Sequence, residues 1–446
     1  MADLAPPFIK TIVKRNGTLV AYRRDRIANA IYQATAAISQ PDQDLSNRMA
    51  SAVEKELLAA YGPDGQPTVE DIQDVVEATL MTHRLTRLAK AYIIYRHDRA
   101  LARAARSLPG EVSDNIPYKH IYEVLLWNTD QGCLTAQDLN DIIAQDRFPN
   151  LIASAEARYT EQLETVARQI LARRDKVRLV IVAGPSSSAK TTTTLRLRES
   201  LTQAGMHLLS IEMDNYFFNL VEHPRDDFGD YDYERPQALN LDLINRHIAE
   251  LLAGREIKTP HYDFKTGIST LEVHPLRLPP DGVLLIDSLH GLYAPMTDQT
   301  SDAHKFKVYV ETLAQFRGAD GNFMRWADLR LLRRMVRDKA FRNHQPLDTL
   351  THWHYVRRSE LQDIIPHIHR ADAILNTALP YELPILKQRL FPYFPEALER
   401  FRNVPRRQDA FRRAQRIYDL LAPLSPAEVP AGIPQNSVIR EFIGYG

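Results

Sequence analysis

The chain has 446 residues, which is too long for one hydrophobic core and predicts two or three domains. Its 44% apolar and 25% charged residues are ordinary for a globular protein. The 56 basic and 56 acidic side chains balance, which excludes a global field that would draw the chain to nucleic acid or to a membrane. Any partner must therefore be recognised locally.

The cysteine content and the apolar runs indicate where the protein works. Cys133 is the only cysteine, so an internal disulfide and a thiolate metal site are excluded, which favours a reducing compartment. The first 17 residues lack the apolar core of a signal peptide, and no stretch approaches the ~18 apolar residues of a membrane span. We expect a soluble, cytoplasmic protein.

The first hundred residues predict a short hairpin followed by helices. Apolar runs at 8–13 and 19–22 flank Asn16-Gly17, a pair that favours a hairpin turn. Thr68 and Asp71 predict a capping box that opens one of the helices. Apolar residues at helical spacing predict four helices, within residues 27–34, 49–57, 72–80 and 85–104. A small domain over 8–105 follows, with a boundary at Pro109-Gly110.

The rest of the chain predicts an α/β domain with a mostly parallel sheet. Residues 111–174 have helical patterns and are expected to form a connecting region. A continuous β-branched run at 179–183, typical of a strand buried on both faces, opens a domain over 175–395. Similar runs recur at 208–213, 283–286, 306–310 and 373–375. Residues 396–446 are expected to form a helical segment and a Pro-rich tail that wraps over the surface.

The segment from Gly184 to Thr192 has the clearest functional pattern in the chain. A phosphate-binding loop needs inward backbone N–H groups, a lysine for the terminal phosphates and a hydroxyl for Mg²⁺ at a helix N-terminus. Ala189 replaces the usual glycine, which the loop tolerates if its φ is not strongly positive. The alternative is a Ser-rich turn without a ligand. The expected nucleotide contacts are Gly184, Ser186, Ser187, Ser188, Ala189, Lys190, Thr191 and Thr192.

Two carboxylates follow predicted strands. Asp214 would lie at the carboxyl edge of the sheet, where it could accept a proton from an attacking hydroxyl. Asp287 would reach the same edge and lie near Mg²⁺ together with Thr191. The alternatives are a helix N-cap or a turn residue for Asp214 and a solvated turn for Asp287.

Basic and imidazole side chains form two further patterns. Arginines at i, i+3, i+4 and i+7 of one predicted helix suit a lid that closes on transferring phosphates, although a solvated charged face is the alternative. These are Arg330, Arg333, Arg334 and Arg337. Two His-x-His pairs, at 352–354 and 367–369, lack a nearby carboxylate or cysteine to complete a zinc site. We interpret these histidines as ordinary polar residues.

Between about 177 and 390 the chain resembles the uridine kinase and phosphoribulokinase family. The matching motifs are GPSSSAKTT, DNYF, TPHYDF, LLIDSLHGL and RLLRRMVRD, in the family's order; TLTHWHYVRRSELQDIIPHIHRADAILN and SVIREFIGYG extend the match to a longer bacterial branch. The resemblance implies a P-loop kinase that uses ATP and Mg²⁺. It assigns phosphate and Mg²⁺ contacts to Lys190 and Thr191, the general base to Asp214, a Mg²⁺-side carboxylate to Asp287, base stacking to Tyr262 beside Asp263, and lid roles to Arg334 and Arg337.

The substrate-reading positions depart from that family. Uridine kinases have a histidine that reads the pyrimidine where this chain has Gly267, and a ribose-binding aspartate where it has Gln237. The lid's Arg-Gly pair is Arg342-Asn343 here. Because the phosphoryl-transfer residues are kept while these differ, the resemblance supports a kinase more strongly than it supports uridine as the acceptor.

The N-terminal hundred residues resemble a second family, the ATP-cone, a regulatory module of ribonucleotide reductases and their repressor. The matching segments are VKRNG, Arg26-Ile27 with Ala30-Ile31, TVEDIQDVVE and AYIIYR. The resemblance implies a regulatory site for ATP or dATP formed by Lys14, Arg15, Asn16, Gly17, Arg26 and Tyr95. Lys14 and Arg15 beside a tight turn would suit triphosphate oxygens. The alternative is an exposed hairpin, and Asn16 replaces the commoner aspartate.

Together these features predict an ATP-dependent kinase of a nucleoside hydroxyl, most simply the 5′-OH, with an adenine nucleotide sensor at its N-terminus. One alternative is a kinase of another sugar-like or phosphorylated alcohol. Another is a nucleotide-sensing regulator without turnover, although the chain lacks the cysteine set and basic patch of a DNA-binding protein. We expect a homo-oligomer, because ATP-cones commonly act by changing subunit association.

Overall fold

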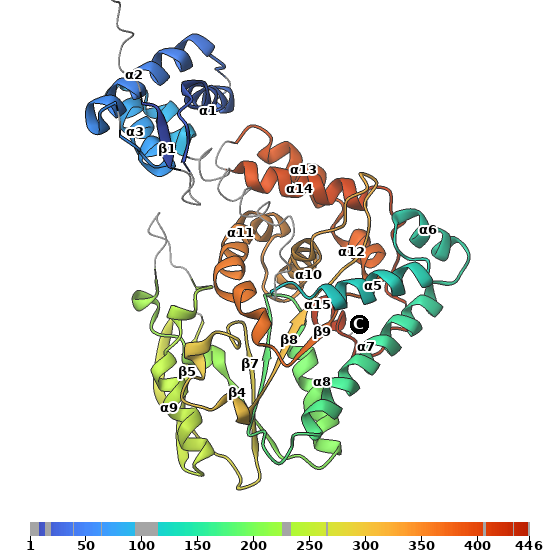
Figure 1. Ribbon diagram of the computed structural model, residues 1–446. Coiled ribbons are helices and arrows are strands. Elements are labelled where there is room, and N and C mark those ends of the chain that lie inside the picture. The colour runs from blue at the N-terminus through green and yellow to red at the C-terminus, as the bar shows by residue number, and fades with distance from the viewer. Residues whose placement is uncertain are drawn as a thin grey trace, which may run out of the picture. The chain divides into compact units, whose positions relative to one another are not determined.

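The computed structural model divides the chain into two compact units, Met1–Val112 and Ser113–Gly446 (Figure 1). It describes residues 9–13, 19–38, 40–63, 65–93, 115–224, 233–264, 266–404, 407–430 and 432–444. Among the described helices, none has the length and apolar composition needed to cross a membrane.

The first unit is a short antiparallel strand pair followed by helices, as expected. Its elements are β1 (Thr11–Val13), β2 (Leu19–Ala21), α1 (Arg24–Ala37), α2 (Gln43–Tyr61), α3 (Val69–Thr82) and helical residues 86–93. The apolar positions that predicted the helices form one core, which includes Ile31, Val53 and Val76. The Asn16-Gly17 turn and the end of the fourth predicted helix lie outside the described residues.

The predicted capping box starts α3 and ties the hairpin to it. The Thr68 hydroxyl accepts a hydrogen bond from Asp71 N at 3.1 Å, and the Asp71 carboxylate accepts one from Thr68 N at 2.8 Å. Val13 N donates to Pro67 O at 3.1 Å, immediately before this cap. The cap therefore satisfies two backbone donors that the helix leaves unpaired and fixes its start beside the hairpin.

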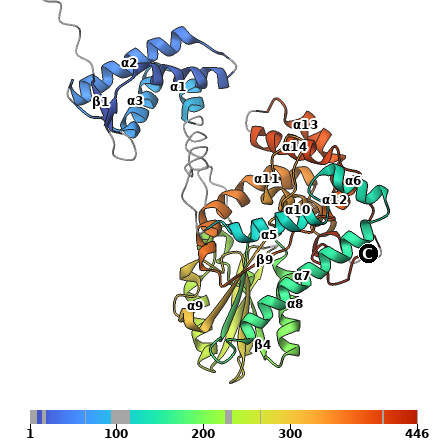
Figure 2. The same cartoon turned by 45° about the vertical axis from the view of Figure 1, so that its right-hand side comes forward.

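The second unit is built on a five-stranded parallel sheet in the order β4-β7-β3-β8-β9 (Figure 2). The strands are β3 (Leu179–Ala183), β4 (Leu208–Glu212), β7 (Val283–Ser288), β8 (Lys305–Glu311) and β9 (Ala373–Asn376). All five coincide with the predicted apolar runs. Along β3, Val180 and Val182 face one core and Leu179 and Ile181 face another, which explains why this run has no polar position.

Helices cover both faces of this sheet (Figure 2). The helices of the second unit are α5 (Tyr118–Asp130), α6 (Ala136–Ala144), α7 (Phe148–Leu171), α8 (Lys190–Gln203), α9 (Leu241–Leu252), α10 (Trp326–Phe341), α11 (Pro346–Ser359), α12 (Glu382–Leu390), α13 (Tyr393–Phe401), α14 (Gln408–Leu421) and α15 (Arg440–Ile443). Shorter helical turns span Met213–Tyr216, Leu220–Glu222, Pro236–Ala238, Ala294–Met296, Asp302–His304, Glu360–Ile364 and Ile365–Arg370.

The expected division of residues 111–446 into three regions differs from the structure. Helix α7 was expected in a separate connecting region, yet its buried face, including Leu163 and Ile170, shares one hydrophobic core with the sheet. Leu421 of α14 belongs to the same core. The connecting region, the kinase-like domain and the C-terminal segment therefore form one unit, because their apolar faces are buried against one another.

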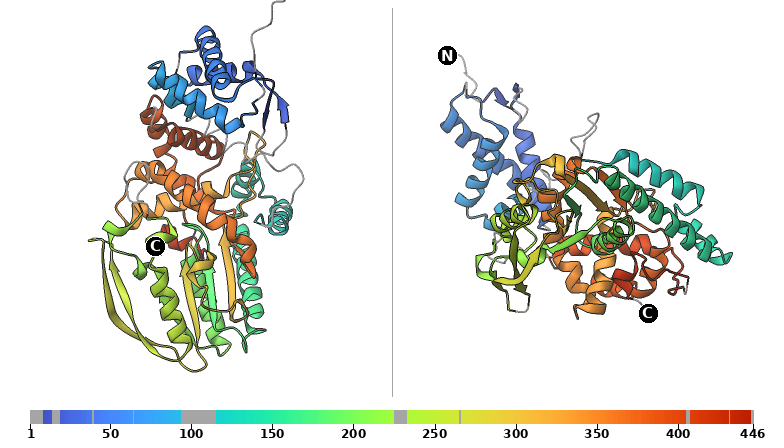
Figure 3. Two further views of the ribbon diagram at one scale, coloured as in Figure 1. Left: turned by 60° about the vertical axis from the view of Figure 1, so that its left-hand side comes forward. Right: turned by 90° about the horizontal axis from the view of Figure 1, so that it is seen from below.

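A two-stranded antiparallel ribbon beside α9 was not predicted. It consists of β5 (Glu256–Asp263) and β6 (Ile268–Arg277) and is yellow-green in the left view of Figure 3. Most β6 side chains are exposed, including Leu271 at 61%. Apolar and polar residues alternate in β6 only at Leu271-Glu272-Val273-His274, and Leu271 and Val273 are exposed, so the pattern marks no buried face.

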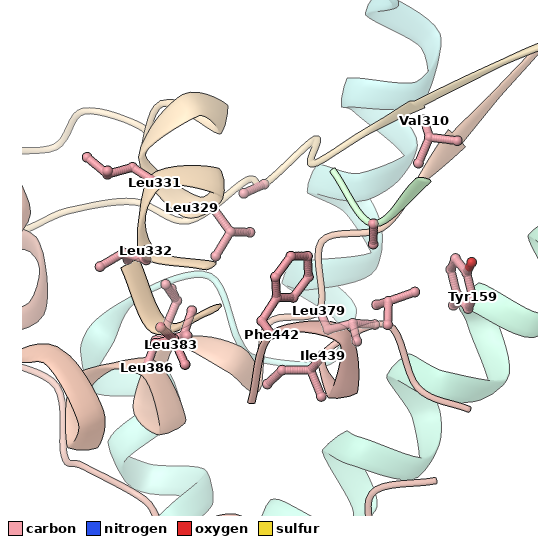
Figure 4. Close-up of a cluster of buried hydrophobic side chains, with 14 of the residues drawn as sticks. Tyr159, Val310, Leu329, Leu331, Leu332, Leu379, Leu383, Leu386, Ile439 and Phe442 are labelled. Atoms are coloured by element: carbon pink, nitrogen blue, oxygen red, sulfur yellow. The ribbon is translucent and has the colours of Figure 1, made fainter. Parts of the chain in front are cut away.

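The C-terminal tail is part of the core and does not merely wrap over the surface. Ile439 and Phe442 are fully buried, and Figure 4 shows them among side chains of α10 and α12. The Ser437 hydroxyl lies 3.1 Å from the Tyr381 hydroxyl, and Arg440 Nη2 donates to Ile433 O at 3.0 Å. Helix α15 also packs against α10, so the tail is held both by these hydrogen bonds and by buried apolar contacts.

Candidate active site

The phosphate-binding loop connects β3 to α8 in the predicted register. Gly184 follows the last residue of β3, at a point where β8 passes very close. A Cβ atom at residue 184 would lie 2.2 Å from the carbonyl oxygen of Val310, so only glycine fits there. This close approach places the loop over the carboxyl edge of the sheet, where ligands bind in parallel α/β folds.

Ala189 does not meet the condition under which alanine was expected to fit the loop. Its φ is +68° and its ψ +36°, in the left-handed region, and Ser187 also has a positive φ of +61°. This conformation costs a residue with a Cβ roughly 1–2 kcal/mol. The loop still forms: Ala189 is 1% exposed, and its carbonyl accepts a hydrogen bond from Thr193 N at 3.1 Å.

Lys190 is the first residue of α8 and lies among carboxylates. Burial lowers its pKa, while Asp287, Glu441 and Asp214 act in the opposite direction. Its Nζ donates to Pro185 O at 3.2 Å, across the base of the loop. A partly desolvated cation held at this point is suited to the terminal phosphates of a nucleotide.

Thr191 and Asp287 form the candidate Mg²⁺ position. Thr191 Oγ1 donates to Asp287 Oδ2 at 3.2 Å, so the start of α8 meets the end of β7. Burial raises the pKa of Asp287 to about 6. Among the described residues no three His, Cys, Asp or Glu side chains gather as a metal cage. One hydroxyl and one carboxylate fit Mg²⁺, because this ion is commonly bound by one or two protein oxygens together with phosphates and water.

Asp214 lies in the helical turn Met213–Tyr216, directly after β4. Its side chain still reaches solvent, but the surrounding protein desolvates it enough to raise its pKa, and Lys190 partly opposes that shift. The structure therefore brings Asp214 and Lys190 to one edge of the sheet, as the sequence predicted.

The arginine stripe of α10 divides into two pairs with different surroundings. Arg330 and Arg333 are fully buried in ion pairs. Arg330 Nε lies 2.8 Å from Glu311, and Arg330 also pairs with Glu360. Arg333 makes two 2.7 Å bonds to Glu382. The hypothesis of four lid arginines is wrong for these two, because each already has a buried anionic partner.

Arg334 and Arg337 remain partly accessible, with 15% and 16% of their side chains exposed. Arg334 Nη1 donates to Ser186 Oγ of the loop at 3.1 Å, and its Nε lies 3.3 Å from Asp338. Burial and nearby arginines lower the pKa of Arg337 to about 10. Arg334 therefore lies beside the loop, and Arg337 lies within electrostatic reach of Lys190, while their lid roles stay a prediction.

An aromatic cavity of about 400 Å³ lies next to Arg334. The Tyr262 and Phe217 rings have centroids 5.3 Å apart, and the His223 ring stacks on Tyr262 at 6.1 Å with 18° between planes. Arg334 lines the same cavity, so one side chain joins it to the phosphate-binding loop.

Only some of the residues predicted to contact the acceptor line this cavity. Tyr262 lines the cavity, whereas Gln237 is exposed and is not among the lining residues. Asp263 follows Tyr262 and accepts a hydrogen bond from Thr266 Oγ1 at 3.0 Å. Gly267 lines the cavity, with a φ of +70°, and a Cβ there would lie 2.7 Å from Leu220 Cβ. Leu220 thus takes the space that a histidine at residue 267 would need.

Several residues that line the cavity were not predicted from the sequence. They are His223, Glu234, His344, His352 and Tyr355, which come from three separate segments of the chain. His352 belongs to a His-x-His pair that was interpreted as ordinary polar residues. No local signal distinguishes these positions, since only the fold brings them to one cavity.

The regulatory residues stay a prediction. Arg26 is exposed on α1. Lys14, Arg15, Asn16, Gly17 and Tyr95 lie outside the described residues.

Comparison with known proteins gives two matches along the chain. Residues 10–101 match the ATP cone domain, and residues 179–381 match the phosphoribulokinase / uridine kinase family. The uridine kinase of Oceanobacillus iheyensis is 31% identical over 196 residues, covering 44% of this chain and 83% of the relative. The uridine kinase of Deinococcus deserti is 29% identical over 195 residues, covering 44% and 84%.

The N-terminal part has relatives of another kind. The vitamin B12-dependent ribonucleoside-diphosphate reductase of Thermoplasma acidophilum is 36% identical over 111 residues, which cover 24% of this chain and 14% of the reductase. The loop geometry, the two carboxylates at the sheet edge and these matches lead to one conclusion: the chain belongs to the phosphoribulokinase and uridine kinase family of kinases and carries an ATP cone domain ahead of its kinase unit.

Proposed function

We propose that the protein transfers the γ-phosphate of ATP to the 5′-hydroxyl of a nucleoside. The observation that carries this proposal is the position of Arg334, which bonds the loop at Ser186 and lines the aromatic cavity. Donor phosphates and an acceptor would therefore meet at one guanidinium. Phosphoryl transfer depends mainly on such positioning and on charge stabilisation.

In this proposal each candidate active-site residue has one role in the phosphoryl transfer. Asp214 accepts the proton of the attacking hydroxyl, while Lys190, Arg334 and Arg337 stabilise the charge on the transferring group. Thr191 and Asp287 would hold Mg²⁺, which supplies charge neutralisation at the phosphates when bound. The rings of Tyr262, Phe217 and His223 line the cavity and would contact a planar base bound in it.

A second acceptor class is a phosphorylated sugar alcohol. Arg334, His344 and His352 line the cavity and could donate hydrogen bonds to an acceptor that already carries a phosphate, although Glu234 lines it too and pairs with Arg334 at 3.4 Å. The ring faces of Tyr262 and Phe217 favour the nucleoside. A screen of ATP consumption by the purified protein across nucleosides and sugar phosphates separates the two classes. Turnover with nucleosides alone supports the proposal, and turnover with sugar phosphates alone replaces it.

Regulation through the ATP cone is the second part of the proposal. An adenine nucleotide, ATP or dATP, binds the N-terminal unit and changes turnover or subunit association. Such an effect requires that the bound nucleotide favours one arrangement of the chain over another.

A further inference from the structure

A carboxylate from the end of the chain lies at the first turn of α8. Glu441 Oε2 accepts hydrogen bonds from Thr192 N at 3.1 Å and from Thr192 Oγ1 at 2.8 Å. Thr192 is the third residue of α8, so its N–H has no partner within the helix. Unpaired N–H groups at the start of this helix are the ones that a phosphate-binding loop offers to a nucleotide.

We infer that Glu441 is an internal competitor of the nucleotide: its carboxylate fills a phosphate position at Thr192, and the phosphates of ATP bind there only when this side chain turns away. One N–H cannot serve a carboxylate and a phosphate oxygen at once. The inference rests on the proposed function only in taking Mg·ATP as the ligand of the loop.

The backbone that carries Glu441 is fixed, so the contact does not come from a loosely lying tail. Val438, Ile439 and Phe442 are fully buried on either side of it, and Arg440 is held by Ile433 O at 3.0 Å. Glu441 itself is only half-buried. Binding of a nucleotide therefore requires rotation of one side chain, while α15 can stay packed against α10.

The charges around the loop favour that rotation once phosphates arrive. Glu441, Asp287 and Asp214 already act together on Lys190. Phosphate oxygens would add further negative charge beside Glu441, which repels the carboxylate. Arg337 lies within electrostatic reach of Glu441 and offers a cation toward which the displaced carboxylate can turn.

The test compares Glu441→Gln and Glu441→Ala with the wild type in the full-length chain. Glutamine keeps an acceptor oxygen but loses the charge, and alanine removes both. The matched control is Glu428→Gln, which changes an exposed glutamate elsewhere in the tail. Calorimetry measures Mg·ATP binding, and the loop site is identified as the one that Lys190→Ala removes. Inorganic tripolyphosphate serves as a second probe that lacks the nucleoside.

We expect about tenfold tighter binding of both probes in Glu441→Ala, which corresponds to about 1.4 kcal/mol. Glu441→Gln should lie between alanine and the wild type, and Glu428→Gln should match the wild type. Equal affinity in all proteins, or weaker binding without Glu441, would overturn the inference while leaving the kinase assignment intact. Binding of neither probe to the loop in any protein would overturn both.

Discussion

Arg334 Nη1 lies 3.1 Å from Ser186 Oγ, so α10 meets the phosphate-binding loop 148 residues earlier in the chain. Arg333, the preceding residue, lies in the protein interior and is fully buried in an ion pair with Glu382. Helix α10 therefore contributes Arg334 to the candidate active site and Arg333 to the buried core.

Substitution of Arg333 should lower folding stability, whereas substitution of Arg334 should lower activity. Arg333→Ala leaves Glu382 buried without its cation, which should cost about 3–5 kcal/mol of folding stability. Arg334→Ala should leave the unfolding free energy within about 1 kcal/mol and lower kcat, since Arg334 is partly exposed. Denaturant unfolding and steady-state kinetics measure the two effects. A stable Arg333→Ala protein with slow turnover would reverse the assignment.

Lys190→Ala should abolish most phosphoryl transfer, because it removes the cation placed for the terminal phosphates. A loss of roughly 10²–10³ in kcat is expected by analogy with the removal of a single preorganised transition-state donor. The control is Lys176→Ala, which changes an exposed lysine before β3. A kcat near the wild-type value would contradict the site.

Asp214→Asn should lower kcat and leave ATP affinity nearly unchanged, because Asp214 acts on the acceptor. Burial raises the pKa of Asp214 above the ordinary value of 3.8. The protonated carboxyl cannot accept a proton, so wild-type kcat/KM should fall with acidification at a higher pH than an ordinary aspartate would give. Asp214→Asn should lack this acidic limb, and an unchanged pH profile would exclude Asp214 as the base.

Acceptor specificity should be altered or relaxed relative to uridine kinases, with deoxynucleosides among the substrates. Gly267→His should not restore the family's pyrimidine reading, because the new Cβ would meet Leu220 and the backbone has a φ of +70°. The expected result is a lower melting temperature without a gain in activity toward uridine, and Leu220→Ala should not restore stability, because alanine keeps the Cβ atom that lies 2.7 Å away. Strict preference of the wild type for uridine and cytidine would show that other residues read the base.

The regulatory prediction concerns two separate nucleotide sites. Calorimetry should find two sites in the wild type and one after replacing Lys14 and Arg15 with alanine, with basal catalysis retained. Arg48→Ala with Lys55→Ala, at exposed positions of α2, is the matched control and should keep both sites. A single site in both proteins, or regulation that persists without residues 1–105, would show that the ATP cone does not regulate the kinase.

Much of the kinase unit could be predicted from the sequence, because its signals are local. Each central strand is a short apolar run, since both faces of the sheet are covered. The loop motif specifies its own register through the order of strand, turn and helix, which places Lys190 and Thr191 at the start of α8. Asp214 and Asp287 follow from the rule that parallel strands end at one edge.

Contacts between distant segments were decided only by the tertiary structure. Helical spacing puts Arg330, Arg333, Arg334 and Arg337 on related faces, but the buried glutamates that hold the first two come from β8, the turn after α11 and α12. Glu441 meets Thr192 across 249 residues. Sequence periodicity records which side of an element is apolar, whereas the partner of each charge depends on which elements the fold packs together.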